Sequence, residues 1–189
     1  MDNKLFLKEY FEEFKSLISS DNNLINDLNY FSELLKEVHS KGKKAIIVGN
    51  GGSAAIASHF SVDLTKNARI RCINFNEADL ITCFANDYGF DNWIKHAVDF
   101  YGDKGDVFIG ISSSGESKDI IKGCISAREN NFSKIVTFSG FEKNNKLKKC
   151  GDLKFWVDSR AYNMIENIHQ FWLLSVVDLI IGKTEYSAN

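Results

Sequence analysis

Apolar residues follow two different patterns along this chain. In the first forty residues they recur at helical spacing, in runs from Leu5 to Ile18 and from Leu24 to Val38, with polar residues 19–23 between them. That spacing predicts two helices, separated by a helix stop and a new N-cap. After Gly42, short and wholly apolar runs alternate with helical ones, which is typical of a parallel sheet covered by helices on both faces.

The second pattern predicts the elements of the sheet and of its covering layers. We expect strands near residues 45–48, 69–74, 106–111, 135–139 and 153–157. We expect helices near residues 53–66, 77–85, 92–101, 118–130, 144–149 and 163–181. The predicted fold class is therefore α/β, a three-layer α/β/α sandwich with a five-stranded parallel sheet, preceded by an N-terminal helix pair.

The length of the chain predicts its domain organisation. With 189 residues we expect one domain over 1–189, made of a helical hairpin over 1–41 and the sandwich over 42–189. The two N-terminal helices are expected to lie antiparallel. Their apolar stripe, which includes Phe6, Phe11 and Phe14, is wider than a lone helix needs. We expect it to pack on the rest of the domain or on another subunit.

Composition excludes several classes of protein. A net charge of −2 gives no electrostatic basis for binding nucleic acid, which usually leaves a basic footprint. No leader-like layout opens the chain, and no run approaches the 18 or more apolar residues of a membrane span, so we expect no membrane partner and a cytoplasmic location. The four cysteines lack C-x-x-C spacing and are predicted to be free, mostly buried thiols.

Two turns carry the strongest chemical signal. A glycine turn, Gly49 to Ser53, follows the first predicted strand, and a serine turn, Ser112 to Ser117, follows the third. Both precede helices, whose N-terminal amides attract anions, and both fall at carboxyl ends of parallel strands, where ligands bind. Together they predict a phosphate-bearing ligand. The plain alternative for the serines is an N-cap with ordinary turn residues.

Two pairs of titratable residues share helix faces. His59 and Asp63 are four residues apart, and Glu166 and His169 are three apart on a very apolar helix. Such pairs suit two ligands of one divalent metal, or a base with its orienting partner. The alternative for the first pair is a solvent-facing ion pair on an amphipathic helix. Glu166 and His169, in contrast, lie on an apolar helix, where polar groups are costly to bury unless they find hydrogen-bond partners or face a cavity.

Several motifs in order resemble the SIS (sugar isomerase) domain, and within it the phosphoheptose isomerases. They are Gly49-Asn50-Gly51-Gly52-Ser53-Ala54-Ala55, His59-Phe60, Ala85-Asn86-Asp87-Tyr88-Gly89, Lys104-Gly105-Asp106-Val107 and Ile109-Gly110-Ile111-Ser112-Ser113-Ser114-Gly115-Glu116-Ser117. Together with the N-terminal helices they cover nearly the whole chain. The resemblance implies an aldose–ketose isomerase that converts sedoheptulose 7-phosphate, in the synthesis of sugars for bacterial surface polysaccharide.

The resemblance also implies roles for individual residues. The serine turn would hold the sugar phosphate, through Ser112, Ser113, Ser114 and Ser117. The sugar itself would be lined by Asn50, Gly51, Gly52, Ser53, Asn86 and Asp87, although a C-cap and turn also account for the last two. A tetramer with active sites between subunits is implied, as is a metal bound by a His, Glu, Gln, His set.

The chain departs from that family pattern at three positions. The catalytic Glu of the family corresponds to Asp63, the Gln of the last helix to Glu166, and the catalytic His to Leu174. One positioned acid or base contributes about 10²–10⁴-fold in rate, so these changes bear on turnover. We keep two hypotheses: a phosphosugar isomerase with a rearranged site, and a non-catalytic phosphosugar-binding protein that acts as a regulator or protein-interaction scaffold.

In the first hypothesis the expected catalytic residues are Asp63, Glu166 and His169. Asp63 or Glu166 would be the base, and His169 or His59 the acid or a metal ligand. His59, Asp63 and Glu166 together form a plausible ligand set for Zn²⁺ or another divalent metal, and no organic cofactor is expected.

Overall fold

The central sheet is fully parallel, as predicted. The computed structural model describes residues 2–18 and 21–185, and across these residues it forms one five-stranded sheet in the order β2-β1-β3-β4-β5. The strands are β1 (Ala45–Val48), β2 (Cys72–Ile73), β3 (Val107–Ser112), β4 (Lys134–Ser139) and β5 (Leu153–Trp156). From β1 the chain first adds β2 on one side and then β3, β4 and β5 on the other, which creates a topological switch point between β1 and β3.

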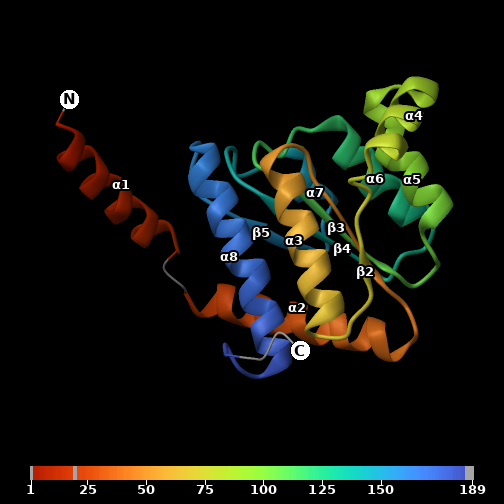
Figure 1. The fold of residues 1–189 in the computed structure, drawn as a ribbon, viewed down its shortest axis with the longest axis horizontal. Helices are drawn as coiled ribbons and strands as arrows, with labels where there is room; N and C mark the ends of the chain where they lie inside the picture. The colour runs from red at the N-terminus through yellow and green to blue at the C-terminus, as the bar shows by residue number, and fades with distance from the viewer. Residues whose placement is uncertain (1, 19–20, 186–189) are drawn as a thin grey trace.

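Helices cover both faces of the sheet (Figure 1). One face packs against α2 (Asn22–Ser40), α3 (Gly52–Lys66) and α8 (Tyr162–Ile181), and the other against α5 (Trp93–Tyr101), α6 (Lys118–Glu129) and α7 (Lys146–Cys150). Neighbouring strand residues face opposite cores: Ile47 lies in the first and Ile46 in the second. This alternation explains why the strands are apolar on both faces and confirms the three-layer sandwich.

Two predicted boundaries change in the structure. The strand expected over 69–74 shrinks to β2, because Arg69 has a positive φ of 61° and the Ile70 amide still bonds to Leu64 at the end of α3. The helix expected over 77–85 continues to Tyr88 as α4 (Ala78–Tyr88), followed by the 3₁₀ turn η1 (Phe90–Asn92). Asn86 and Asp87 therefore lie in a helical turn rather than in a loop.

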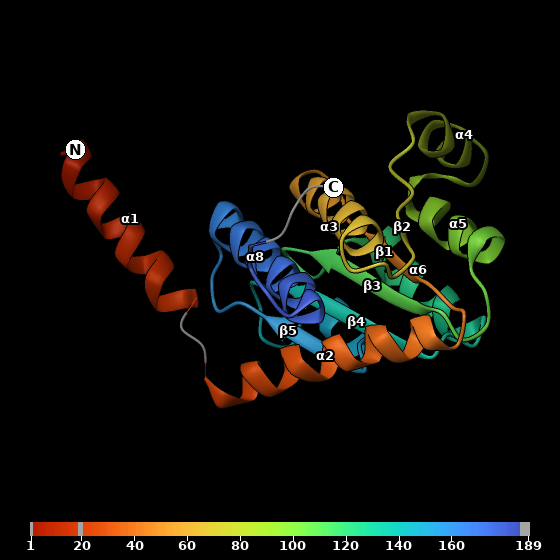
Figure 2. The ribbon, with the colours of Figure 1, turned by 60° about the horizontal axis from the view of Figure 1, so that its bottom comes forward.

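The N-terminal helices do not form the expected antiparallel pair. α1 (Asn3–Ile18) extends away from the body of the molecule, whereas α2 lies against it (Figure 2). Phe31, Leu34 and Leu35 of α2 are already buried in the core, which leaves α1 no broad apolar face on that helix. Asp21 caps α2 by accepting a hydrogen bond from the Leu24 amide at 2.8 Å, while Ser19 and Ser20 of the predicted stop lie outside the described residues.

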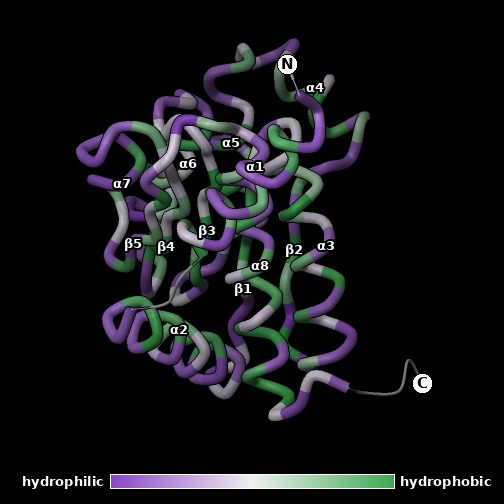
Figure 3. The backbone as a smooth tube through the Cα atoms, turned by 90° about the vertical axis from the view of Figure 1, so that its left-hand side faces the viewer, coloured by the Kyte–Doolittle hydropathy of each residue, from purple (hydrophilic) through white to green (hydrophobic). Residues whose placement is uncertain are grey.

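α8 is the very apolar helix that the sequence predicts, but no segment was expected to be long and apolar enough to cross a membrane. Among the described helices it is the one long and apolar enough, by length and composition, to cross a membrane. Its residues Ile165, Ile168 and Leu173 are, however, fully buried against the sheet, next to α2 and α3. Figure 3 shows hydrophobic residues along this helix and the central strands. α8 is therefore placed as a core helix of the sandwich.

Candidate functional site

A small pocket opens at the switch point between β1 and β3. Its volume is about 140 Å³. It is lined by the last residues of β3, by residues that follow β1 and β3, and by two residues of α8: Asn50, Ser53, Ile111, Ser112, Ser113, Ser114, Ser117, Tyr162 and Glu166. The glycine turn and the serine turn thus meet at one edge of the sheet, where open parallel sheets bind ligands. The sequence-predicted juxtaposition of the two turns is present.

The serine turn holds its hydroxyl groups in fixed positions. Ser112 and Ser117 share a hydrogen bond of 2.9 Å between their hydroxyl oxygens. Gly115 makes the turn possible, because its φ is +69° and a Cβ there would lie 2.1 Å from the buried Asn145 side chain. The Ser113 hydroxyl is buried and has no hydrogen-bond partner among the described residues. A buried hydroxyl without a partner is costly unless a ligand or water satisfies it.

Close approach of α8 requires a glycine in the first turn of α3. A Cβ on Gly52 would lie 2.2 Å from Glu166 Oε2, so the carboxylate rests directly against this turn. Gly51 has a φ of +54° and caps the helix without a side-chain hydrogen bond. The side-chain amide of Asn50 is held in place because it donates to both carboxylate oxygens of Asp119, at 3.1 and 2.9 Å. The glycine turn is therefore tied to both α6 and α8.

The electrostatics of this pocket come from backbone dipoles. No Lys or Arg is among its described lining residues. α3 and α6 both begin at the pocket, and neither N-cap residue, Gly51 or Ser117, caps its helix with a side-chain hydrogen bond in the structure. Free amides and the positive ends of two helix dipoles attract an anion there. Burial raises the pKa of the Glu166 carboxyl, because the charged form loses solvation.

A second polar cluster lies two turns further along α3. His59 Nε2 is 3.3 Å from Asp63 Oδ2, and the other ring nitrogen, Nδ1, is 3.2 Å from the Gln170 amide of α8. With the amide donating to Nδ1, Nε2 carries the proton and donates to Asp63. Asn67 donates to the second oxygen of Asp63 at 3.2 Å. Gln170 and Asn67 thus orient the pair that the sequence predicted.

His169 is not part of either cluster, contrary to the prediction. It is fully buried in the core, where its ring lies against Phe138 and Trp172 and Nε2 donates to the Ser139 carbonyl at 3.2 Å. Burial lowers its pKa to about 4, so the ring is neutral at pH 7. An apolar helix buries most of its circumference, and His169 lies on the side that faces the sheet, whereas Glu166 faces the pocket.

Asn86 and Asp87 also lie away from the pocket. Both are exposed on α4, where Asn86 donates to Asp87 at 2.9 Å, and neither lines the pocket in this single chain. The helix carrying them stands at the edge of the molecule (Figure 1). The prediction that they line the ligand is therefore not met by the residues of one chain.

The proposed ligand set for a metal is not assembled either. Within residues 2–18 and 21–185 the structure has no group of three or more His, Cys, Asp or Glu side chains placed to hold a metal ion. Glu166 lies against Gly52 in the serine pocket, whereas His59 and Asp63 lie further along α3. Two ligands on one helix do not complete a divalent site. The residues of one chain do not fit the metal that the family pattern implies.

Sequence reasoning missed three residues that shape the site. Asp119 is buried and binds Asn50, Tyr162 lines the pocket, and Gln170 binds His59. One signal was available for Asp119, which is an acidic residue in the first turn of a helix that follows the serine turn. For Gln170 the spacing of four from Glu166 places both on one face of α8.

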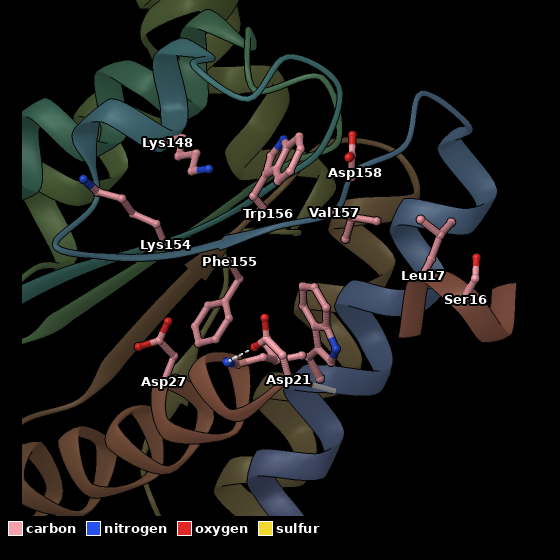
Figure 4. Close-up of a pocket in the computed structure, with 12 residues that line it drawn as sticks. Ser16, Leu17, Asp21, Asp27, Lys148, Lys154, Phe155, Trp156, Val157 and Asp158 are labelled. Atoms are coloured by element: carbon pink, nitrogen blue, oxygen red, sulfur yellow. Dashed lines mark hydrogen bonds between the residues drawn. The ribbon is translucent and has the colours of Figure 1, made fainter. Parts of the chain in front are cut away.

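A larger cavity elsewhere lacks these features. It has a volume of about 410 Å³ and lies between the end of α1, the start of α2 and β5 (Figure 4). The Lys148 ammonium lies 4.7 Å from the centre of the Trp156 ring. Burial and the neighbouring Asp21 raise the pKa of Asp27. It contains neither predicted turn and mixes charges of both signs. We therefore take the switch-point pocket as the candidate site.

Known proteins share both this sequence and this architecture. The SIS domain family model matches residues 9–139. A phosphoheptose isomerase of Fusobacterium nucleatum is 35% identical over 153 residues, covering 78% of this chain and 77% of that protein. A phosphoheptose isomerase of Sulfurimonas denitrificans is 32% identical over 175 residues, covering 88% and 89%. The solved phosphoheptose isomerase of Neisseria gonorrhoeae superimposes with a TM-score of 0.85 at 25% identity, covering 94% and 98%.

Proposed function

The chain belongs to the SIS domain family, and on that premise we propose that it is a phosphosugar aldose–ketose isomerase. The proposed reaction converts D-sedoheptulose 7-phosphate to D-glycero-D-manno-heptose 7-phosphate, in the synthesis of surface-polysaccharide sugars. One observation carries the proposal: the buried, unpartnered Ser113 hydroxyl in a pocket between the N-termini of α3 and α6. A phosphate oxygen satisfies that hydroxyl.

The phosphate occupies the serine pocket in this proposal. Hydroxyls of Ser113, Ser114 and Ser117 and the free amides of α6 donate to its oxygens. A volume of about 140 Å³ is below the roughly 300–1,000 Å³ of complete ligand pockets. The pocket therefore accepts the phosphate end, and the carbon chain extends out of it.

The seam between α3 and α8 gives the carbon chain its direction. It starts at Gly52 and Glu166 and continues to His59 and Gln170. Along α3 these positions are about 10 Å apart, at roughly 1.5 Å per residue. An extended chain of seven carbons with bonds of about 1.5 Å spans about 7.5 Å, and its phosphate ester extends that to about 10 Å. With the phosphate on C7 in the serine pocket, C1 and C2 reach His59 and Asp63.

Asp63 is then the proposed base. Isomerisation removes a proton from C1 of the ketose, passes through an enediol and returns a proton to C2. Asp63 can do both, because it is held by His59 and Asn67 and its side chain remains 23% exposed. On substrate binding, the Nε2–H of His59 would exchange its bond to Asp63 for one to a sugar oxygen as charge develops there. Glu166, the other candidate base, lies near the phosphate end of the seam.

A divalent metal stays a prediction from the sequence and the family pattern. No step above passes through one, since the residues of one chain do not complete its ligand set. Metal analysis of the purified protein tests the prediction: bound Zn²⁺ or another divalent ion, with activity lost to a chelator, supports it. A metal-free preparation with unchanged activity contradicts it.

We also propose a homo-oligomer, with a tetramer as the expected state, located in the cytoplasm. An apolar groove of about 550 Å³ runs along the outer face of α8, lined by Phe171, Leu174 and Leu179 among others. α1 exposes Leu5, Phe6 and Phe11. Exposed apolar surface of this extent favours contact with another copy, which would also cover the open side of the seam. A monomer at micromolar concentration in light scattering contradicts the proposal.

The test of the function is direct. The protein is incubated with sedoheptulose 7-phosphate, and aldose signals are followed by ¹H NMR, with unphosphorylated sedoheptulose as the control. We expect conversion of the phosphate ester alone. The second hypothesis is a non-catalytic phosphosugar-binding regulator or scaffold. It is favoured by Leu174, which lines an apolar groove and stands where the family has its catalytic histidine. Binding by calorimetry without any conversion overturns the isomerase and supports that second function.

A further inference from the structure

Two cysteines meet outside the candidate site. Cys124 lies on α6 and Cys150 is the last residue of α7. Both line a cavity of about 420 Å³, together with Ile125, Arg128, Glu129, Ile135 and Lys149. The two thiols interact electrostatically, and the Cys150 thiol itself donates a hydrogen bond to the Lys146 carbonyl at a sulfur–oxygen distance of 3.4 Å. Cys124 is 1% exposed, whereas Cys150 is half-buried and accessible from the cavity.

The charged groups around the cavity favour a thiolate on Cys150. Arg128 of α6 donates to the Cys150 carbonyl at 3.0 Å and pairs with Asp152 at 3.0 Å. The other charged groups lining the cavity are Glu129 of α6 and Lys149 of α7, and β4 contributes the apolar Ile135. The pKa of Cys150 is lowered to about 7, first by its interaction with the Cys124 thiol and then by Arg128. The same interaction and burial raise the pKa of Cys124 well above its usual range.

We propose that Cys150 and Cys124 form a peroxide-reactive thiol pair, with Cys150 as the nucleophile and Cys124 as the resolving thiol. Three observations support it: the shared cavity, the Arg128 guanidinium on the Cys150 carbonyl, and the half-buried position of Cys150 beside a fully buried thiol. Reactive cysteines are partly exposed and lie near cationic groups. Cys150 is half-buried beside Arg128 and Lys149, whose charges are balanced by Asp152 and Glu129. A second thiol within contact distance allows a sulfenic acid to be trapped as a disulfide.

The chemistry balances with a hydroperoxide as the oxidant. The Cys150 thiolate attacks the terminal oxygen of the peroxide, the O–O bond breaks, and an alkoxide leaves and takes a proton from water. Cys150 is oxidised to a sulfenic acid and the peroxide is reduced to an alcohol. The Cys124 sulfur then attacks the Cys150 sulfur, a disulfide forms, and water leaves with the sulfenic oxygen and the Cys124 proton.

The other two cysteines serve as internal controls. Cys83 is exposed on α4, and its thiol donates to the Asp87 carboxylate at a sulfur–oxygen distance of 3.7 Å. Exposure alone would therefore favour oxidation of Cys83. Cys72 is buried, and burial raises its pKa, which disfavours reaction. The proposal predicts that Cys150 reacts first despite its smaller exposure.

The experiment treats the full chain with one equivalent of hydrogen peroxide at pH 7 and maps tryptic peptides without reduction. Trypsin separates the two thiols, because it cuts after Lys122, Arg128, Lys149 and Lys154. We expect residues 123–128 linked to residues 150–154, with Cys83 still reduced. Iodoacetamide should alkylate Cys150 about three-fold faster than free cysteine at pH 7, with a midpoint near pH 7.

Two variants separate the roles. In Cys124→Ala the linked peptide is lost and a dimedone adduct appears on Cys150, whereas Cys150→Ser gives neither product. Circular dichroism verifies that both variants are folded, and the wild-type peptide map does not depend on them. Oxidation of Cys83 before Cys150, or no linked peptide after peroxide, overturns the proposal. None of these measurements depends on sugar turnover, so they test the thiol pair independently of the proposed function.

Discussion

The two ends of the α3–α8 seam are built in different ways. At the serine pocket the backbone fixes the geometry: Gly52 and Gly115 are required by close contacts, and Ser113 is buried. At the other end, His59 is 48% exposed and is held only by side chains of the two helices. The difference teaches that one chain by itself shapes the pocket that we propose for the phosphate. The end that we propose for the reaction depends instead on side-chain contacts and on what covers the seam.

The largest expected effect comes from removing the charge of Asp63. Asp63→Asn should lower kcat about 10²–10⁴-fold, because a positioned base is lost, while KM changes little. Steady-state kinetics with sedoheptulose 7-phosphate measures both constants. Asp158→Asn is the matched control, since Asp158 is exposed and does not line the switch-point pocket. Full activity in Asp63→Asn would show that the base lies elsewhere, with Glu166 the next candidate.

His169 should affect stability rather than catalysis. Its folded-state pKa of about 4 is below the ordinary 6.5, so between these values the unfolded chain binds more protons. Stability is therefore highest above pH 6.5 and decreases as the pH falls toward 4, by roughly 3 kcal/mol from this group.

Urea unfolding across this pH range measures the effect. His169→Leu should flatten the decrease, and His39→Gln, which changes an exposed histidine, should leave it unchanged. The same decrease in wild type and His169→Leu would contradict the assignment of His169 to the core. Loss of catalysis in a stably folded His169→Leu variant would show that His169 belongs to the active site.

Serine substitutions test the other end of the seam. Ser114→Ala and Ser117→Ala should each weaken phosphosugar binding by about 1.5–3 kcal/mol, because each loses a hydrogen bond to a charged group. Calorimetry with sedoheptulose 7-phosphate measures the change, and Ser40→Ala, on the exposed end of α2, is the control. If affinity is unchanged in both variants, the serine turn does not hold the phosphate.

The smallest effect is expected from Glu166→Gln, and its sign is informative. A carboxylate beside a phosphate disfavours binding, and partial burial already raises the pKa of the Glu166 carboxyl. We expect the neutral amide to tighten phosphosugar binding a few-fold above pH 7, with kcat nearly unchanged. A large loss of kcat with unchanged affinity would instead identify Glu166 as the base.

The local patterns were sufficient for most of the fold. Strand β1 was predicted at its observed bounds, and the two turns were placed at the correct edge of the sheet, because apolar runs and turn residues act within a few positions. The direction of α1 was not predictable in this way. It depends on α2 having already buried Phe31 and Leu35, which is a tertiary effect.

The site was predicted less completely, for the same reason. The serines and His59–Asp63 follow from local spacing, whereas contacts between distant segments do not. Nothing near Gly52 in the sequence indicates that Glu166 rests against it, and nothing near His59 indicates Gln170. On α8, spacing alone could not distinguish His169, which faces the core, from Glu166, which faces the pocket.

The orientation of the substrate along the seam is the central claim, and a ligand-bound crystal structure of Asp63→Asn tests it most directly. Crystals are soaked with sedoheptulose 7-phosphate. The account predicts phosphate oxygens within hydrogen-bond distance of Ser113, Ser114 and Ser117, and C1 and C2 beside His59 and residue 63. A phosphate bound outside the serine pocket, or C1 and C2 beside Glu166 with the phosphate toward His59, would contradict it.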